Sequence, residues 1–484
     1  MKGCYYYGQE DNVKVLFALH DLGFADHISI AHLSAIARQS GHKTYFTLLD
    51  KFPEAQRELK PDIVAYSANI LGYKRIVEAN TIARRERQFI SIMGGAQPTF
   101  SPETFPASGM DAYCVGEGDY AFRDFLDNIG DFNSVDNLLT RLKKNPIRPL
   151  INNLDDLPPA DRGLILGHSF LKNASKKTFY ATRGCPFNCA YCCNNYYHQL
   201  YKGQPPVRRF SVERLIREME DVRSRYRMDF VKLGDDCFTI KADEWLEEFA
   251  NKYSQRIGIP FNCYLRVDTI DDGMLGLLRK AGCFSVTLSV DSTSPYIREH
   301  ILHRRMRAEN VVERLRKVRE YGINTLVNYM LAVPESTLQD DLDTIKQARE
   351  ANITWMNYTT TVPMDKTELY NYCVAHELLN PLTYEGDMGG CMERSELSCF
   401  TEKERDIRFN IFLLGEWIAK LPPMLGNIVS YLIRVIPPNR LFRMFNAMRF
   451  RWYMEHKIFE VSDNFSVPRF WQRDENEKSK HNLD

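Results

Sequence analysis

Three cysteines lie close together near residue 190, in the segment Thr182-Arg183-Gly184-Cys185-Pro186-Phe187-Asn188-Cys189-Ala190-Tyr191-Cys192. Cys185, Cys189 and Cys192 are separated by three and then two residues, in a loop that a glycine and a proline bend. Thiolates are soft ligands that suit iron–sulfur clusters and zinc. Zinc sites usually add a second pair of Cys or His ligands further on, and no such pair follows here. The spacing therefore favours a [4Fe–4S] cluster with one open iron; a zinc knuckle or a chance group of buried thiols is the alternative.

The cysteine loop resembles the signature loop of radical S-adenosylmethionine (SAM) enzymes, in which an aromatic residue, here Tyr191, precedes the last cysteine. The resemblance implies that Cys185, Cys189 and Cys192 hold the cluster and that the open iron chelates the amino and carboxylate groups of SAM. It also implies an external electron donor of the flavodoxin or ferredoxin type. Reduction of the cluster then cleaves SAM to methionine and a 5′-deoxyadenosyl radical.

Length and composition exclude some classes of protein. At 484 residues, two or three domains are expected, and 63 basic residues against 63 acidic residues give no electrostatic reason to propose a nucleic-acid partner. Twelve cysteines without a signal peptide indicate a reducing, cytoplasmic environment in which thiols serve metals. No window reaches the roughly 18 to 20 apolar residues of a transmembrane helix. We therefore expect a protein that is soluble or peripheral to a membrane.

The first third of the chain alternates strand patterns with helical patterns, which predicts an α/β fold with a doubly wound, Rossmann-like sheet. A helix is expected over 28–39, where apolar residues recur near the 3.6-residue period, and Gly41 ends it. Strands are expected at 13–19, 43–49, 61–67, 89–93 and 112–115. Ligands of such folds lie at the carboxyl ends of the strands. These ends correspond to the loop 20–26, Ser67-Ala68-Asn69 and Gly94-Gly95-Ala96-Gln97-Pro98-Thr99.

This region resembles the cobalamin-binding domain that precedes many radical SAM cores. The resemblance lies in Gly94-Gly95-Ala96-Gln97-Pro98-Thr99, Pro102-Glu103 and Gly116-Glu117-Gly118-Asp119. It implies that cobalamin is contacted by Ser67, Gly94, Gly95, Gln97, Thr99 and Glu117. The Asp-x-His-x-x-Gly motif that supplies a histidine to cobalt elsewhere is absent, and Gln97 stands where relatives often have His. Cobalt is therefore expected to lack a histidine ligand, with His20 as the weaker candidate. In the alternative interpretation, the paired glycines only turn the chain.

A second strand–helix alternation begins near residue 165 and resembles the open, partial (βα)6 TIM-type barrel of radical SAM enzymes. Chemistry in such barrels lies at the carboxyl ends of the strands. Strands are expected at 178–182, 230–233, 261–265, 285–290, 325–331 and 355–362, and helices at 211–227, 243–257, 271–282, 307–321 and 337–350. Ser211 is expected to cap the first of these helices, because its hydroxyl can accept from a free backbone N–H.

The resemblance also assigns residues to SAM. Gly234-Asp235-Asp236 occupies the place of the family's Gly-Gly-Glu segment, which binds the SAM ammonium group, although the aspartates would also suit a helix cap. Asp291 and Ser292 stand where relatives carry a Glu-Ser pair near the SAM ribose, and Ser289 replaces the usual glycine. Arg266 either meets the SAM carboxylate or forms an ordinary salt bridge, and the sequence favours neither.

These patterns divide the chain into a cobalamin-binding domain over 1–145, a linker over 146–170, a radical SAM core over 171–375 and a mainly helical C-terminal domain over 376–484. The C-terminal domain starts with a helix expected over 402–420. Its last residues, 472–484, are charged and expected to be disordered.

Residues 424–459 mix apolar and aromatic side chains with six Arg or Lys. Such a stretch can lie on an anionic membrane surface. It can equally pack over the barrel mouth with its arginines in water. We favour the packing, and membrane contact would fit a hydrophobic substrate.

The expected function is that of a cobalamin-dependent radical SAM methyltransferase acting on an unactivated carbon of a small-molecule, lipid or tetrapyrrole-like substrate. The resemblance implies that the deoxyadenosyl radical abstracts a hydrogen atom and that methylcobalamin delivers the methyl group. No catalytic side chain is assigned, because the cofactors carry the difficult steps. A radical SAM cyclase or oxidase without methyl transfer is the alternative within the family. A non-catalytic cobalamin or cluster sensor is the alternative outside it.

Overall fold

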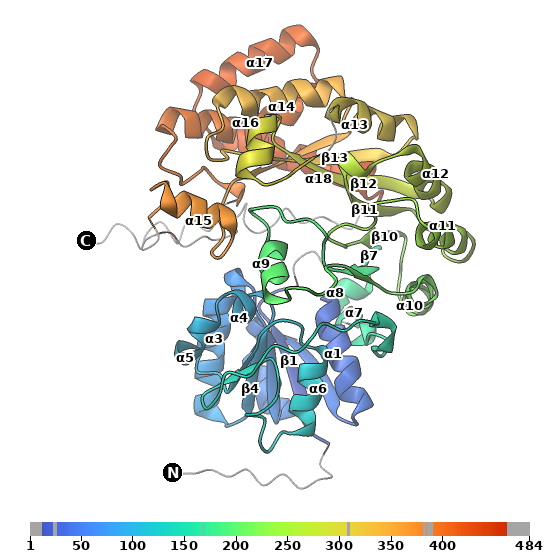
Figure 1. Cartoon of the computed structure of the whole chain (residues 1–484), viewed down its shortest axis with the longest axis vertical. Coiled ribbons are helices and arrows are strands. Elements are labelled where there is room, and N and C mark those ends of the chain that lie inside the picture. Colours follow the sequence, from blue (N-terminus) through green and yellow to red (C-terminus); the bar gives the residue numbers. More distant parts are fainter. Residues whose placement is uncertain are drawn as a thin grey trace. The chain divides into compact units, whose positions relative to one another are not determined.

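The computed structural model describes residues 12–22, 27–167, 169–306, 310–380, 384 and 391–461 (Figure 1). It divides into two compact units. The first unit comprises Met1–Phe187 and Cys192–Arg227, and the second comprises Asn188–Tyr191 and Met228–Asp484. The division passes through the cysteine loop and assigns the expected linker to the first unit.

A six-stranded sheet forms the centre of the first unit, in the order β2-β1-β3-β4-β5-β6. Its strands are β1 (Lys14–Leu19), β2 (Lys43–Leu48), β3 (Ile63–Ser67), β4 (Ile90–Gly94), β5 (Ala112–Cys114) and β6 (Leu138–Thr140). The first five strands pair in parallel, as the strand–helix alternation predicts, and β6 pairs antiparallel with β5. The sequence analysis does not predict β6.

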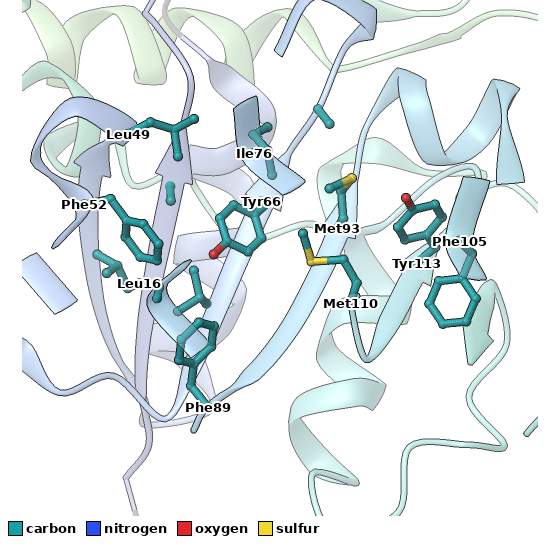
Figure 2. Close-up of a cluster of buried hydrophobic side chains, with 14 residues drawn as sticks. Leu16, Leu49, Phe52, Tyr66, Ile76, Phe89, Met93, Phe105, Met110 and Tyr113 are labelled. Carbon is teal, nitrogen blue, oxygen red and sulfur yellow. The ribbon is translucent and has the colours of Figure 1, made fainter. Parts of the chain in front are cut away.

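Helices cover both faces of this sheet. They are α1 (Ile28–Gln39), α2 (Phe52–Leu59), α3 (Ile70–Glu86), α4 (Ala96–Phe100), α5 (Phe105–Ser108) and α6 (Asp119–Asp127). Figure 2 shows the core on one face, where Leu16 and Tyr66 of the sheet are buried with Phe52 of α2 and Ile76 of α3. On the other face, the ring of Phe17 lies 5.8 Å from that of Phe122 on α6. The doubly wound sheet is therefore confirmed.

The rest of the first unit, in its described part, contains four α-helices and three strands. They are α7 (Arg162–Leu166), α8 (Ser169–Lys172), β7 (Lys176–Phe179), β8 (Thr182–Arg183), α9 (Cys193–Leu200), β9 (Arg208–Arg209) and α10 (Val212–Arg225). The expected cap of α10 is present, because the Ser211 hydroxyl accepts a 3.2 Å hydrogen bond from the Arg214 N–H.

The six strands expected for the partial barrel are all present. They are β7, β10 (Phe230–Leu233), β11 (Phe261–Arg266), β12 (Cys283–Asp291), β13 (Asn324–Leu331) and β14 (Trp355–Thr360). Within the second unit the order is β14-β13-β12-β11-β10, and every neighbouring pair is parallel. The accompanying helices are α11 (Glu244–Arg256), α12 (Asp272–Ala281), α13 (Val311–Glu320), α14 (Leu338–Glu350) and α15 (Glu368–Ala375).

The end of the described chain packs at the amino ends of the barrel strands. Met454 and Ile458 are buried in a cluster with Phe230 and Trp355, each the first residue of its strand. The Ser285 hydroxyl donates a 2.5 Å hydrogen bond to the Ile458 carbonyl. The last residues of the basic, aromatic stretch therefore pack on the barrel. They pack at the amino ends of the strands, whereas the sequence analysis expected packing over the mouth, at the carboxyl ends.

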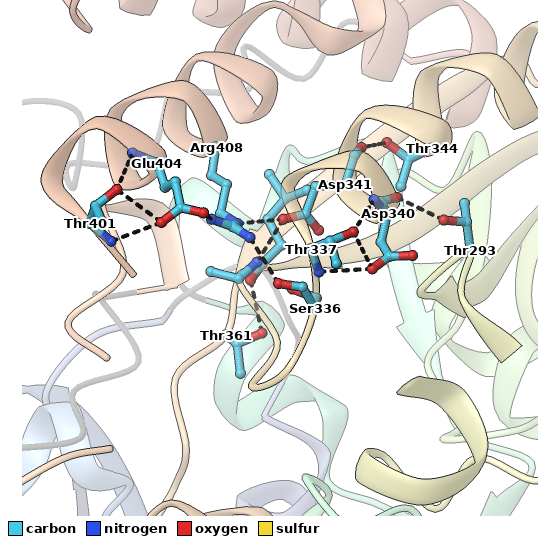
Figure 3. Close-up of polar contacts among 12 residues, drawn as sticks. Thr293, Ser336, Thr337, Asp340, Asp341, Thr344, Thr361, Thr401, Glu404 and Arg408 are labelled. Atoms are coloured by element: carbon cyan, nitrogen blue, oxygen red, sulfur yellow. Dashed lines mark hydrogen bonds and ion pairs between the residues drawn. The ribbon is translucent and has the colours of Figure 1, made fainter. Parts of the chain in front are cut away.

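Three helices precede that end: α16 (Glu402–Lys420), α17 (Pro423–Val435) and α18 (Arg440–Tyr453). α16 has the predicted range and begins with a capping box, in which Thr401 and Glu404 each accept the other's backbone N–H. Figure 3 shows this box beside a buried ion pair, in which Arg408 Nε lies 2.6 Å from Asp341 Oδ2. α17 packs on α16 through Asn410, whose amide donates to the Ile433 carbonyl at 2.9 Å.

Two sequence predictions concern membranes and disorder. Across the part of the chain that the structure describes, no helix is both long enough and apolar enough to cross a bilayer. The tail 472–484 and part of the loop 20–26 lie outside the described residues.

A buried glutamate on α16 makes stability depend on pH. Both carboxylate oxygens of Glu416 are buried without a hydrogen-bond partner among the described residues, and Arg449 Nη2 lies 3.6 Å from Oε2. Burial raises the pKa of Glu416 from 4.5 to about 7, although Arg449 and Lys420 act in the other direction. The pKa is higher in the folded state than in the unfolded state, so protonation of Glu416 favours folding. This contribution to the free energy of unfolding is complete below pH 4.5 and is lost as pH rises through 7.

We expect Glu416 to lower the free energy of unfolding by up to about 3 kcal/mol between about pH 5 and pH 8. Glu416→Gln cannot ionise and should flatten this decline, as measured by urea unfolding with tryptophan fluorescence. Glu350→Gln, an exposed change on α14, is the control and should keep the wild-type profile. An equally steep decline in Glu416→Gln would contradict the assignment.

Candidate functional site

The cysteine loop has cationic hydrogen-bond donors beside one of its three thiols. Cys189 is buried, whereas Cys185 and Cys192 are half-buried. Two guanidinium groups donate to the Cys189 sulfur, Arg266 Nη1 at 3.8 Å and Arg304 Nη1 at 4.0 Å. Hydrogen bonds and positive charge at a sulfur favour the thiolate form that a cluster needs. The surroundings of Cys189 therefore suit a cluster ligand.

Helix α9 provides hydrogen-bond donors to the first-unit part of the loop. The Asn194 side-chain amide lies 3.7 Å from the Cys192 sulfur, and His198 Nε2 lies 2.7 Å from the Cys185 carbonyl oxygen. No three His, Cys, Asp or Glu side chains within the described ranges converge as the ligands of a single metal ion do. An iron–sulfur cubane differs from an ion, because each thiolate binds its own iron at a separate corner.

A buried network anchors the second-unit part of the loop, Asn188–Tyr191. The Tyr191 hydroxyl donates to Asp291 Oδ2 at 2.6 Å, and Arg304 Nη1 lies 3.0 Å from the same oxygen. Arg304 also donates to the Ser289 carbonyl at 2.6 Å. Burial alone would lower the pKa of Arg304, but Asp291 and Tyr191 raise it above its ordinary value. The guanidinium therefore stays charged, and the network holds the aromatic residue of the loop in place.

The residues expected near the SAM ribose lie at the carboxyl end of β12. Asp291 ends this strand with φ at +67°, a left-handed conformation that costs free energy outside glycine and that clusters at functional sites. The Ser289 hydroxyl accepts from Asn328 Nδ2 at 3.2 Å. The Ser292 hydroxyl accepts from the Ser294 N–H at 3.2 Å. All three predicted residues are therefore at the expected strand end, with their side chains already engaged within the protein.

Two open alternatives concern Arg266 and the segment Gly234-Asp235-Asp236. Arg266 forms a salt bridge, with Nε 2.7 Å from Asp268 Oδ1. The segment directly follows β10, with Asp235 buried and Asp236 exposed. The helix-cap interpretation of these aspartates is wrong, because Asp243 caps α11 by accepting from the Leu246 N–H at 3.1 Å.

The first unit contains a cavity of about 320 Å³ at the carboxyl ends of its strands. Its wall includes four of the residues predicted to contact cobalamin, namely Ser67, Gly94, Gly95 and Glu117. Gln97 and Thr99 are buried and do not line it. Residues that the sequence did not suggest also line it, among them His32, Asp119, Arg183, Tyr197 and Phe210. Its volume suits a small ligand or one part of a large one.

Thr99 fastens two glycine loops at the cavity to each other. Its hydroxyl donates to the Gly95 carbonyl at 2.8 Å and accepts from the Gly116 N–H at 3.0 Å. Gly95 has φ at +99°, and a Cβ there would lie 2.8 Å from the Ala68 carbonyl oxygen, so that only glycine fits. The glycine therefore turns the chain and also permits a close backbone approach.

The acidic residues of the segment 116–119 bind two arginines. Arg183 Nη1 lies 2.8 Å from Glu117 Oε1 and 2.7 Å from Asp119 Oδ2. Arg208 Nη1 lies 2.9 Å from Glu117 Oε2. Burial alone would raise the pKa of Asp119, but Arg183 lowers it below its ordinary value. Because Arg183 stands two residues before Cys185, this network joins the sheet's loop to the start of the cysteine loop.

One histidine lines the cavity and another does not. The His32 ring stacks on Phe210 with centroids 6.0 Å apart, and its buried Nδ1 has no hydrogen-bond partner within the described part of the chain. Burial, assisted by Arg183, lowers the pKa of His32 from 6.5 to about 4, so the imidazole is neutral at physiological pH. His20, the weaker candidate for cobalt, does not line the cavity, and its Nε2 lies 2.6 Å from Asp21 Oδ2.

Arg183, Arg208, Arg304 and His32 are functional candidates that the sequence analysis missed. Arg183 carries the clearest signal, because it immediately precedes Gly184-Cys185. Arg304 lies 113 residues from its partner Tyr191, and neither spacing nor periodicity marks such a pair.

We expect Tyr191→Phe to loosen the cysteine loop without unfolding the second unit. The change removes the hydroxyl that donates to Asp291 but keeps the ring, and a buried hydrogen bond to a charged group contributes about 1.5–3 kcal/mol. The reconstituted variant should release iron to a chelator faster than the wild type. Tyr296→Phe is the control, because it removes a 2.8 Å bond to Glu335 at an exposed position. Iron release at the wild-type rate from Tyr191→Phe would refute the anchoring role.

Two family models match the chain. The radical SAM superfamily matches residues 179–358, and the B12 binding domain matches residues 15–126. The first match spans the cysteine loop and all five strands β10 to β14 except the last two residues of β14. The second spans the five parallel strands of the first unit except Lys14, the first residue of β1.

Known proteins resemble the chain at low sequence identity. It is 25% identical over 339 residues to an uncharacterized methyltransferase of Pyrococcus horikoshii, covering 67% of this chain and 72% of that protein. It is 23% identical over 342 residues to the anaerobic magnesium-protoporphyrin IX monomethyl ester cyclase of Rubrivivax gelatinosus, covering 66% and 60%. The solved structure of the radical S-adenosylmethionine methyltransferase TsrM from Kitasatospora setae, with cobalamin and a [4Fe-4S] cluster bound, matches with a TM-score of 0.65 at 13% identity, covering 89% and 91%. This last likeness is one of fold, and it confirms the predicted fold class.

Proposed function

Because the chain belongs to the radical SAM enzymes that carry a B12-binding domain, we propose that it transfers a methyl group from SAM to an unactivated carbon of a small-molecule, lipid or tetrapyrrole-like substrate. Its cofactors are a [4Fe–4S] cluster, SAM and cobalamin. One observation supports the proposal most strongly. The same chain has a cysteine loop in which two arginines donate to the Cys189 sulfur, and a sheet in the first unit whose strands end at a cavity.

The cysteine loop would hold the cluster through Cys185, Cys189 and Cys192. When bound, the cluster and SAM supply a carbon-centred radical, and cobalamin supplies the methyl group. Arg266 places its donors on Asp268, on the Cys189 sulfur and on the Arg305 carbonyl. We therefore propose that Arg266 supports the cluster ligand Cys189 and does not bind the SAM carboxylate. Its positive charge would offset the negative charge that the thiolates bring.

The SAM site is proposed at the carboxyl ends of β10 and β12. Gly234-Asp235-Asp236 would receive the SAM ammonium group, and Ser289 and Ser292 would face the ribose. Asp291 contributes by position, because its carboxylate is already bound by Tyr191 and Arg304.

The first-unit cavity is proposed to take one part of cobalamin. Ser67 and the paired glycines Gly94 and Gly95 would contact it, and His32 would offer a neutral ring nitrogen as a hydrogen-bond partner. Glu117 would act by holding Arg183 and Arg208. Gln97 and Thr99 would act by supporting the glycine loops.

Two further partners are part of the proposal. The cluster would receive its electron from an external donor of the flavodoxin or ferredoxin type, because the sequence contains one loop of this cysteine spacing and no second. The second proposed partner is a membrane surface, contacted through residues 424–459. Such a contact would favour a lipid-like substrate.

We expect His32→Phe to weaken cobalamin binding. The phenyl ring keeps the stacking on Phe210 and removes the ring nitrogens, so one neutral hydrogen bond is lost and Kd rises roughly 5- to 10-fold. Equilibrium dialysis of hydroxocobalamin measures this. The effect should be constant from about pH 6 to pH 8, because the His32 pKa of about 4 lies below that range. His42→Phe, outside the cavity, is the control, and an unchanged Kd in His32→Phe would remove His32 from the site.

We expect the reconstituted, reduced enzyme to form 5′-deoxyadenosine and S-adenosylhomocysteine from SAM, because the radical step and the methyl supply each consume one SAM. Cys189→Ala should reduce deoxyadenosine to the level of the enzyme-free control. Cys193→Ala, one residue beyond the loop's last cysteine, should retain it. Mass spectrometry of both products, with SAM labelled in its methyl group, makes the measurement.

The same assay separates the alternatives. Deoxyadenosine without S-adenosylhomocysteine or labelled product would support a cyclase or oxidase, the reaction type of one relative's name. No deoxyadenosine above background would support a non-catalytic sensor.

A further inference from the structure

The exposed large apolar side chains of the described residues gather in one stretch of the chain. Twelve of the sixteen lie between residues 424 and 452, on α17 and α18 and the turn between them. The other four are scattered singly, which is normal for a protein surface. A concentration of this kind marks a surface that binds a protein or a membrane.

The apolar side chains of α17 form a stripe on one face of the helix. The stripe consists of Met424, Leu425, Ile428, Tyr431, Leu432 and Val435. Gly426 and Ile433 lie on the other face and are buried. A Cβ on Gly426 would lie 3.2 Å from the Ile418 carbonyl of α16, so α17 rests closely on α16 through that face (Figure 1). The apolar stripe therefore lies on the face of α17 opposite to α16.

The apolar side chains of α18 form a similar stripe. The stripe consists of Leu441, Met444, Phe445, Met448 and Trp452, at the spacing of one helix face. Inward-facing residues hold the helix in place: Tyr453 packs on Trp355 with ring centroids 4.9 Å apart, and Arg449 lies over the Trp417 ring. Phe445 packs on Trp417 of α16 with ring centroids 5.8 Å apart, whereas Leu441, Met444 and Met448 of the stripe remain 50% or more exposed.

Positive charge borders both stripes. Arg434 on α17 and Arg440 and Arg451 on α18 are exposed, and each is adjacent in sequence to a stripe residue, hence rotated from it by about 100°. No Asp or Glu occurs between residues 421 and 454. Apolar side chains with basic residues at their edge are the pattern of a helix that lies in the surface of an anionic membrane.

We propose that α17 and α18 dock the enzyme on an anionic lipid bilayer, with the apolar stripes at the acyl boundary and the bordering arginines among the phosphates. The helices have 13 and 14 residues, and a spanning helix needs about 20, so they lie in the plane of the membrane. A second copy of the chain suits the surface less well, because a two-fold contact would bring like charges together. The membrane contact does not rest on the proposed methyl transfer, and together they name a lipid-like substrate.

The test is co-sedimentation of the full-length reconstituted enzyme with vesicles of phosphatidylcholine alone or with about a third phosphatidylglycerol. We expect binding to the anionic vesicles, weakened by salt. Ile428→Glu puts a charge into the α17 stripe at a side chain that is 51% exposed, and Met448→Glu does the same on α18. Each should lower vesicle affinity roughly 10-fold. Ile82→Glu, at a side chain that is 50% exposed on α3, is the matched control and should bind as the wild type does.

Circular dichroism and iron content equal to the wild type will show that the variants fold. Absence of binding to anionic vesicles, or wild-type affinity in both stripe variants, would overturn the proposal. So would a lipid-free dimer in the ultracentrifuge that Ile428→Glu dissociates, because it would assign the stripe to a second copy. Vesicle binding needs neither SAM nor reductant, so its failure and a failure of methyl transfer are distinguishable.

Discussion

A buried sulfur beside two buried guanidinium groups is the interaction on which the second unit depends. A buried charge without a partner costs several kcal/mol, so each arginine must bring a carboxylate. Arg266 has Asp268 at 2.7 Å, and Arg304 has Asp291 at 3.0 Å. Negative charge at Cys189 is then balanced by cations that are already held in place. This requirement explains why Asp291 is committed to the protein at a strand end where the sequence suggested a ligand.

In the first unit, the start of the cysteine loop is held by buried ion pairs of the same arginine–carboxylate kind. Arg183 lies between Glu117 and Asp119, in a segment whose glycines and acids resemble a ligand-binding loop. Burial alone would lower the pKa of Arg183, but Asp119 and Glu117 raise it above its ordinary value, so the ion pairs persist at physiological pH. An acidic residue beside a cavity can therefore act by holding an arginine in place. Its presence in a motif does not by itself make it a contact.

The sequence predicts local elements well and long-range pairs poorly. α16 is found over the expected residues, and α11, expected at 243–257, is found at Glu244–Arg256, because apolar periodicity and capping residues are local properties. The cysteine loop is visible for the same reason. Arg183 and Glu117 are 66 residues apart, and the fold of the first unit brings them together although no sequence spacing marks the pair. His32 is a candidate because it is buried and because its Nδ1 has no hydrogen-bond partner in the part of the chain that the structure describes; a sequence contains neither property.

The C-terminal helices show why composition did not distinguish packing from exposure. Residues 424–459 mix apolar and basic side chains throughout. Nevertheless, Met454 and Ile458 are buried at the base of the barrel, while Met424 is 74% exposed. The difference lies in which helix face finds a partner. Gly426 and Ile433 lie on the face of α17 that packs against α16. Tyr453 lies on the face of α18 that packs against Trp355 at the base of the barrel. The remaining apolar side chains of α17 and α18 are exposed in the described part of the chain, so one composition yields both a buried face and an exposed face.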